Sequence, residues 1–266
     1  MTRKLFGTDG VRGVAGGLLT AELALGLARA ATRKTGVERP QVLIVRDTRE
    51  SGEMLEAAVA AGVSAAGGDA LLGGVLPTPA APLLIGRYGF DLAVVLSASH
   101  NPYEDNGIKF FAGDGYKLSD ESELAIEREL ERAAGAAGGA VEDPSGNGSA
   151  DRSADAAPTP SAPPAIGRVR QLRGAGEDYL RELHGHFAEL DLGGLDVLLD
   201  CANGATHHVA PEIFRRLGAK VSVIADRPDG RNINAGCGST ATELLSRAVV
   251  EHGADLGLAL DGDADR

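Results

Sequence analysis

Reactive side chains follow an apolar run in the first half of the sequence. Residues 96–111 read LSASHNPYEDNGIKFF, and the preceding run FDLAVVL is typical of a buried strand. Ser99 and His100 therefore stand at the end of a core strand, and Lys109 follows within the next apolar segment. A hydroxyl, an imidazole and an amine placed together in this way indicate group-transfer chemistry.

A second such place is the stretch LALDGDADR, where carboxylates occupy alternate positions. Asp261, Asp263 and Asp265 lie on one side of an extended or looped backbone, so their charges repel one another. Oxygen ligands favour Mg²⁺ or Ca²⁺ over zinc. The stretch offers only a few protein ligands, which favours Mg²⁺ over Ca²⁺, because Mg²⁺ keeps water and phosphate oxygens among its ligands. An EF-hand is excluded, because Arg266 stands where that loop requires glycine. A solvated acidic turn is the alternative.

Ser99 lacks the surroundings of a hydrolase nucleophile. The nucleophile elbow has glycine two residues before and after the serine, whereas Ser97 and Asn101 occupy those positions here. A phosphoserine is better supported, because its charge of about −1.5 to −2 at neutral pH could be offset by a metal and by Lys109. A covalent phosphoserine would divide phosphoryl transfer into two steps. His100 as a turn residue and Lys109 as a solvent-facing residue are the alternatives.

A third unusual stretch, FGTDGVRG at 6–13, is rich in glycine and polar side chains. We interpret it as a flexible loop before the first helix, able to bring backbone amides to a phosphate. It lacks the GK[ST] ending of a P-loop. Arg12 within it carries a guanidinium that fits a phosphate or a carboxylate.

The charge and composition narrow the classes of partner. The sequence has 26 Lys and Arg against 38 Asp and Glu, giving a net charge of −12, which disfavours nucleic acid and anionic lipid. No segment approaches the roughly 20 apolar residues that cross a bilayer, and the N-terminus lacks a signal-peptide pattern. With two cysteines and no C-x-x-C, we expect reduced thiols and a cytoplasmic location.

The elements that must position these residues alternate between helix and strand, which predicts an α/β fold with sheets flanked by helices. Thr20 is the expected N-cap of the first helix and Ser119 that of the last helix before residue 135. The first half is expected to contain helices at 20–34, 51–68 and 119–134, and strands at 41–47, 70–77, 91–99 and 107–111, the last returning as in a hairpin.

Residues 135–165 consist mainly of Gly, Ala, Ser, Pro and Asp and are interpreted as a linker or insertion. They separate two expected α/β domains, residues 1–134 and 166–266. Strands at 195–200, 220–226 and 255–261 alternate with helices at 206–219 and 240–254, which predicts a parallel βαβαβ unit. Thr240 and Glu243 form an expected capping box. Ligand sites gather at the carboxyl ends of such strands, so we expect Ser99 and the aspartates to meet across an interdomain cleft.

Together these stretches resemble the α-D-phosphohexomutase family. SASHNP is similar to the phosphoserine loop of that family, and DGDADR is similar to its Mg²⁺ loop. FGTDGVRG and NINAGCGST (232–240) resemble the phosphoglucosamine mutase branch more than the phosphomannomutase or phosphoglucomutase branches. The resemblance covers nearly the whole chain except residues 135–165, and the three motifs occur in the family's order.

The resemblance implies an isomerase that interconverts glucosamine 6-phosphate and glucosamine 1-phosphate, on the route to UDP-N-acetylglucosamine and the bacterial cell wall. Phosphoserine 99 would phosphorylate the substrate, and the resulting bisphosphate would reorient and return its other phosphate. Mg²⁺ is the implied cofactor, with Ser99, Asp261, Asp263 and Asp265 as its ligands. Other implied site residues are Arg12, His100 and Lys109 in catalysis and Arg266 in substrate binding, with His100 or Lys109 assisting proton transfer.

The resemblance also implies four domains, and we expect this chain to be an amino-terminal portion that lacks the carboxyl-terminal domains and has negligible turnover alone. Expected partners are a phosphosugar and neither nucleic acid nor membrane, and a homo-oligomer is left open. The alternatives are a phosphomannomutase or phosphoglucomutase, a Mg²⁺-dependent phosphatase with Asp261 as nucleophile, and a vestigial metal-binding fragment.

Overall fold

The computed structural model describes residues 4–138 and 165–266. The strands of these residues are β1 (Val11–Val14), β2 (Gln41–Arg46), β3 (Asp69–Val75), β4 (Leu92–Leu96), β5 (Asp105–Ala112), β6 (Val169–Gln171), β7 (Asp196–Asp200), β8 (Lys220–Ile224) and β9 (Leu256–Ala259). The helices are α1 (Ala21–Lys34), α2 (Gly52–Ala65), α3 (Ala80–Tyr88), α4 (Asp120–Gly138), α5 (Ala175–His186), α6 (Val209–Arg216) and α7 (Glu243–His252). The described helices include none with the length and apolar character needed to span a membrane.

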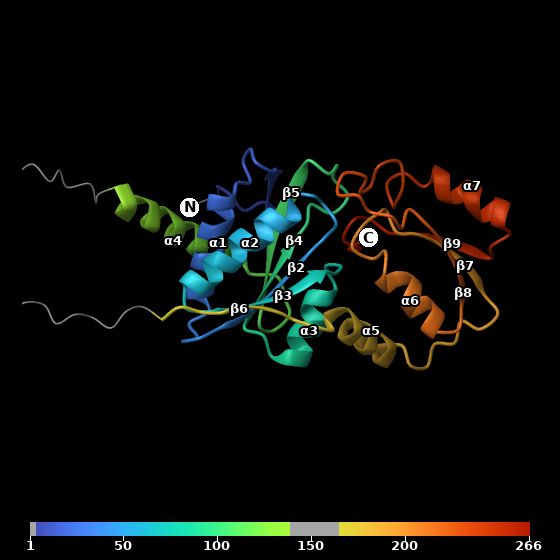
Figure 1. Ribbon diagram of the computed structural model, residues 1–266, viewed down its shortest axis with the longest axis horizontal. Helices are drawn as coiled ribbons and strands as arrows, with labels where there is room; N and C mark the ends of the chain where they lie inside the picture. The colour runs from blue at the N-terminus through green and yellow to red at the C-terminus, as the bar shows by residue number, and fades with distance from the viewer. Residues whose placement is uncertain (1–3, 139–164) are drawn as a thin grey trace, which may run out of the picture.

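These strands form two sheets that lie at opposite ends of the described structure (Figure 1). The first sheet has the order β1-β5-β4-β2-β3-β6, and the second has the order β8-β7-β9. In Figure 1 the chain end at Arg266 lies between the two sheets, so the aspartate stretch faces the first domain. The expected two-domain α/β architecture is confirmed.

The centre of the first sheet is buried on both faces, which explains why its strands are apolar throughout. Val42 and Ile44 of β2 pack into a cluster with α1, α2 and α4, whereas Leu43 and Val45 pack on the other face with α3 and α5. Successive side chains of a strand point to opposite faces, so only a continuous apolar run can fill both. The result is a three-layer α/β/α domain.

Three elements of this domain were not expected from the sequence: β1, α3 and β6, of which β6 is described below with the domain boundary. β1 lies within the stretch interpreted as a flexible loop, and it pairs antiparallel with β5 at the edge of the sheet. α3 joins β3 to β4, both of which pair parallel to β2, and a parallel connection of this kind requires a crossover element. The expected hairpin-like return is confirmed, because β5 runs antiparallel to β4.

The second sheet confirms the predicted βαβαβ unit. β7 pairs parallel with both β8 and β9, with α6 packed on one face and α7 on the other. The capping box is wrong: α7 begins at Glu243 with Thr242 as its N-cap, without a side-chain cap, and Thr240 lies before the helix. The expected cap of α1 is confirmed, since the side chain of Thr20 accepts from the Leu23 amide.

The boundary between the two halves differs from the expectation that residues 166–266 form the second domain. β6 pairs with β3 and therefore extends the first sheet (Figure 1). α5 packs against both halves, because Tyr179 and Leu180 belong to the same apolar cluster as Leu84 of α3 and Ile213 of α6. α4 continues to Gly138, beyond the expected start of the linker, and residues 139–164 of that linker lie outside the described residues.

Candidate active site

The serine loop after β4 and the aspartate loop after β9 meet between the two domains. Ser99 Oγ lies 2.5 Å from Asp261 Oδ2 and 3.1 Å from Asp265 Oδ1, although more than 160 residues separate them in the chain. Both loops follow the carboxyl ends of strands, where ligand sites of α/β sheets gather. The side chains of Ser99 and Asp261 are fully buried.

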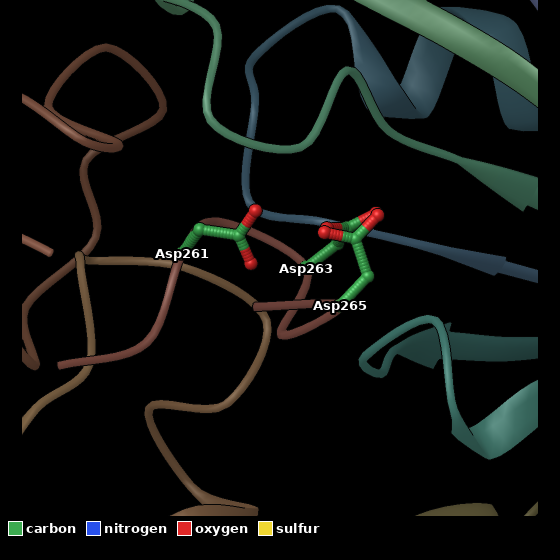
Figure 2. A group of neighbouring side chains, drawn as sticks. All are labelled: Asp261, Asp263 and Asp265. Atoms are coloured by element: carbon green, nitrogen blue, oxygen red, sulfur yellow. The ribbon is translucent and has the colours of Figure 1, made fainter. Parts of the chain in front are cut away.

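The three aspartates form a compact carboxylate cluster. One oxygen from each of Asp261, Asp263 and Asp265 lies within 4.8 Å of the others, and Figure 2 shows the Asp261 carboxylate facing the other two. Oδ1 of Asp261 and Oδ1 of Asp263 are buried and have no hydrogen-bond partner in the described part of the chain. Burial raises the pKa of Asp261 to about 6, and the charges of Asp263 and Asp265 also raise it.

This donor set fits Mg²⁺. Buried acceptors without partners are rare in folded proteins, and a hard divalent cation satisfies carboxylate oxygens directly. A cation would also remove the repulsion that raises the pKa of Asp261. Asp261, Asp263 and Asp265 are therefore the residues that would hold the ion, with Ser99 Oγ beside them.

Lys109 supplies a buried positive charge to this cluster. Its Nζ lies 2.8 Å from Asp263 Oδ2, 3.4 Å from Asp265 Oδ2 and 3.0 Å from Asp9 Oδ2. Only 1% of the side chain is exposed, so the solvent-facing alternative is wrong. Burial lowers the pKa of Lys109, but the charges and hydrogen bonds of Asp263 and Asp9 outweigh it and raise the pKa above its usual value. Lys109 is therefore a cation at neutral pH.

Arg12 and Asp9 join the N-terminal stretch to the serine loop. The Arg12 guanidinium pairs with Asp9 and donates from Nη1 to the carbonyl of Ala98 at 3.4 Å. Arg12 Nε is buried without a hydrogen-bond partner among the described residues. Burial raises the pKa of Asp9, but Lys109 and Arg12 together lower it below its ordinary value. This edge of the site therefore presents cations and an ionised carboxylate.

The remaining candidates lie at the margin of the site. His100 Nδ1 lies 3.4 Å from Ser99 Oγ. Arg266 is more than half exposed, and its Nε lies 3.9 Å from Asp265 Oδ1. The structure thus brings Ser99, His100, Lys109, Arg12 and the three aspartates together, with Arg266 at the exposed rim.

Several residues that hold this site were missed by the sequence analysis. Thr78 donates from Oγ1 to Asp263 Oδ2 at 2.6 Å and from its amide to the Asp263 carbonyl at 2.9 Å. Arg49 and Asn234 donate to backbone carbonyls of the serine loop, and Asp47 accepts from Ser97 Oγ. The stretch RDTRE at the end of β2 carried a usable signal, because opposite charges at the carboxyl end of a buried strand indicate a site.

Fold and site together define a class: a two-domain α/β protein in which a serine of the first domain meets a carboxylate cluster of the second. The model for the phosphoglucomutase/phosphomannomutase alpha/beta/alpha domain I matches residues 3–136, and the model for domain II matches residues 177–266. The chain belongs to the phosphoglucomutase/phosphomannomutase family, which confirms the resemblance seen in the motifs.

Curated relatives are similar along the whole of this chain. It is 50% identical over 271 residues to the phosphoglucosamine mutase of Thermobifida fusca, covering 100% of this chain and 55% of that protein. It is 51% identical over 267 residues to the phosphoglucosamine mutase of Rhodococcus erythropolis, covering 99% of this chain and 55% of that protein. The chain thus spans about half the length of the curated relatives it matches.

Solved structures agree in fold. A phosphoglucomutase/phosphomannomutase family protein of Burkholderia thailandensis superposes with a TM-score of 0.76 at 24% identity, over 98% of this chain and 53% of that one. A phosphoglucomutase from Paramecium, parafusin, gives a TM-score of 0.65 at 19% identity, over 98% of this chain and 51% of that chain. The two-domain arrangement is therefore shared with longer proteins of this family.

Proposed function

We propose that this chain carries the phosphoryl-transfer half of a phosphoglucosamine mutase, which interconverts glucosamine 6-phosphate and glucosamine 1-phosphate. The observation that carries the proposal is the placement of Ser99 Oγ 2.5 Å from Asp261 Oδ2, beside carboxylate oxygens that have no other partner in the described structure. A phosphoserine at this position would lie against any cation held by the aspartates. The identity of about 50% to curated phosphoglucosamine mutases supports the choice of sugar.

The proposed reaction has two balanced transfers at Ser99. A substrate hydroxyl attacks phosphoserine, so that a sugar O–P bond forms, the serine O–P bond breaks, and the hydroxyl gives up its proton. After the bisphosphate reorients, Ser99 Oγ attacks its other phosphoryl group. The serine O–P bond then forms, the second sugar O–P bond breaks, and the released sugar oxygen takes up a proton in place of the one that Ser99 Oγ loses. Bound Mg²⁺ would neutralise the phosphoryl oxygens and stabilise the leaving serine oxygen.

The side chains around Ser99 have different proposed roles in these transfers. Lys109 is protonated, because its pKa is raised, and therefore suits charge neutralisation rather than acceptance of a proton. This leaves the His100 ring, 3.4 Å from Ser99 Oγ, as the proposed proton acceptor. Arg12, with its unpartnered Nε in the described structure, would bind a phosphoryl oxygen, and Arg266 at the exposed rim would bind substrate.

The proposed compartment is the cytoplasm. Both cysteines of the chain, Cys201 and Cys237, are buried free thiols. Burial raises the pKa of Cys201 to about 12, which keeps the thiol protonated and unreactive. Free thiols of this kind agree with a reducing compartment.

Phosphate mapping after incubation with a hexose 1,6-bisphosphate and Mg²⁺ tests the proposal. The expected result is a phosphoryl group on Ser99 that is absent from Ser99→Ala. Label on Asp261 would instead support an aspartyl phosphatase. The matched activity test uses the whole protein, in which glucosamine 6-phosphate should be converted and mannose 6-phosphate should react far more slowly. An equal rate on both sugars would contradict the choice of substrate.

A further inference from the structure

The backbone at Ser99 adopts a conformation that its own sequence does not favour. Its φ is +56°, in the left-handed region where non-glycine residues are uncommon. Such a conformation persists only where the surrounding structure imposes it, and it often occurs at functional sites. The groups that hold this backbone therefore decide where the Ser99 hydroxyl points.

Arg49 holds the serine loop from inside the first domain. Its guanidinium is fully buried and donates from Nη2 to the carbonyls of Ser99 at 2.9 Å and Asn101 at 3.0 Å. Its Nε donates to Asp47 Oδ2 at 2.8 Å. Arg49 therefore binds the loop by its backbone, with its own charge balanced by Asp47.

The same ion pair also reaches the amide side of Ser99. Ser97 Oγ donates to Asp47 Oδ2 at 2.6 Å, and the Ser99 amide donates to Ser97 Oγ at 2.9 Å. The N–H and the carbonyl of Ser99 are thus both fixed by groups connected to the Asp47–Arg49 pair. This leaves the left-handed backbone little freedom to relax.

Asn234 binds the same two carbonyls from the second domain. Its Nδ2 lies 2.9 Å from the Ser99 carbonyl and 3.1 Å from the Asn101 carbonyl. Asn234 also lies next to the aspartate loop at Gly262. A Cβ added to Gly262 would lie only 3.0 Å from Asn234 Nδ2 and 2.7 Å from the Ser99 carbonyl oxygen. One amide therefore connects the serine backbone to the loop that carries the carboxylates.

We propose that Arg49 and Asn234 are positioning residues that share the Ser99 and Asn101 carbonyls and thereby set the Ser99 hydroxyl against the aspartate cluster. The catalytic importance of this positioning rests on the proposed function, whereas the hydrogen bonds themselves involve no substrate. Arg49 fixes the backbone within the first domain. Asn234 fixes that backbone relative to the second domain, and it touches none of the carboxylates by a hydrogen bond that the described structure contains.

Asn234→Ala tests the proposal in the 266-residue chain. The first readout is the ¹³C carbonyl resonance of Ser99, which should move upfield because one of its hydrogen-bond donors is lost. Arg231→Ala is the matched control, since Arg231 also bridges the domains, through Glu50 at 2.7 Å, and contacts the serine loop only at the Tyr103 ring, 5.9 Å away, without a described hydrogen bond to the Ser99 or Asn101 carbonyl. A Ser99 signal that is unchanged in Asn234→Ala, or shifted equally in Arg231→Ala, would overturn the proposal.

The second readout is Mg²⁺ affinity in a double-mutant cycle with Ser99→Ala. Partners that orient metal-site groups typically contribute about 10–100-fold to metal affinity, so Asn234→Ala should weaken binding at least about tenfold. If Asn234 acts through Ser99, its effect should nearly vanish in the Ser99→Ala background, whereas a general structural role would give additive effects. Additive losses would contradict the positioning role.

The two readouts separate this inference from the proposed function. If the chain binds no Mg²⁺, the proposed function fails, and the Ser99 carbonyl shift still decides whether Asn234 positions the serine. Arg49→Lys is the companion variant, because it keeps the charge but loses the planar fork. It should disturb the Ser99 signal more than Asn234→Ala does, and a smaller disturbance would contradict the role given to Arg49.

Discussion

The serine loop and the aspartate loop differ in how far hydrogen bonds within the protein satisfy their polar groups. In the serine loop the carbonyls of Ser99 and Asn101 each accept two hydrogen bonds, and the Ser99 amide is bonded as well. In the aspartate loop two buried carboxylate oxygens have no hydrogen-bond partner within the described ranges. The serine loop is therefore held by protein groups, whereas the aspartate loop has carboxylate oxygens left over that a cation could bind.

This difference matters because phosphoryl transfer depends mainly on positioning and charge neutralisation. The first domain supplies a hydroxyl on a backbone of positive φ, and the second supplies three carboxylates that lie close together. Lys109 of the first domain reaches across to Asp263 and partly offsets their charge. The following tests act on the serine loop, on the aspartate loop and on the contact between them.

The largest expected effect is that of Ser99→Ala in the whole protein. Removing the proposed phosphoryl acceptor should lower turnover by several orders of magnitude, as for other covalent nucleophiles. A coupled assay for glucosamine 1-phosphate measures this loss, with Ser222→Ala on β8 as the control. Turnover retained within about tenfold of the wild type would rule out Ser99 as the carrier.

The second effect concerns the charge balance of the aspartate loop. Lys109→Met leaves buried carboxylates without their cation, so the free energy of unfolding should fall by about 3–5 kcal/mol. Arg216→Met is the control, because its partner Glu177 is half exposed and such surface pairs contribute about 0–1 kcal/mol. Urea unfolding measures both, and saturating Mg²⁺ should restore part of the loss in Lys109→Met only. Equal losses in the two variants would contradict the role given to Lys109.

A smaller effect is expected at the contact between the loops. A Cβ on Gly262 would lie 2.7 Å from the Ser99 carbonyl and 2.7 Å from Ile233 Cδ1, so Gly262→Ala should destabilise by about 1–3 kcal/mol. Gly86→Ala in α3 is the control, because nothing lies within 4 Å of the added Cβ. That substitution in a helix should stabilise by about 0.5–1 kcal/mol. A melting temperature of Gly262→Ala that is equal to or above that of the native chain would contradict close contact between the loops.

The smallest effect is a pH dependence of the aspartate loop. The pKa of Asp261 is raised to about 6, above its unfolded value of about 3.9, so without metal its stabilising contribution is present below about pH 4 and is lost as pH rises to about 6. Mg²⁺ needs the carboxylate, so its affinity should fall by up to about tenfold per unit as pH drops below 6. Calorimetric titrations between pH 5 and 8 measure this, and Asp261→Asn should bind weakly at every pH. Affinity that is constant across this range in the native chain would contradict the burial of Asp261.

Most of the fold could be predicted from the sequence, because its buried strands are continuous apolar runs. The failures occurred where tertiary contacts override local pattern. The polar strand β6 carries three exposed residues and shows no alternation, so only its pairing with β3 identifies it. Thr240 and Glu243 have the spacing of a capping box, but the Ser239 amide is bound by the Leu260 carbonyl and the helix begins only at Glu243.

The sequence predicted the site residues whose chemical type indicates their role. It did not predict the residues whose role is to hold other groups in position. Ser99 and the aspartates could be found because a hydroxyl and paired carboxylates imply phosphate and metal. The charges of RDTRE could have placed Arg49 near the site, but not its hydrogen bonds to the serine loop. Asn234 could not be found, because it binds backbone carbonyls of a distant segment and no motif spacing relates it to them. Asn234 is 135 residues from Ser99 along the chain, yet its Nδ2 lies 2.9 Å from the Ser99 carbonyl, and only the fold brings the two together.

The central claim is that the Ser99 hydroxyl and the three carboxylates share one metal site. A crystal structure of this chain grown with Mn²⁺ tests it most directly, since anomalous scattering locates the ion. We predict one ion bound by Asp261, Asp263 and Asp265, with Ser99 Oγ or its phosphate as a further ligand. An ion bound elsewhere, or a Ser99 side chain turned away from the occupied aspartate loop, would contradict it.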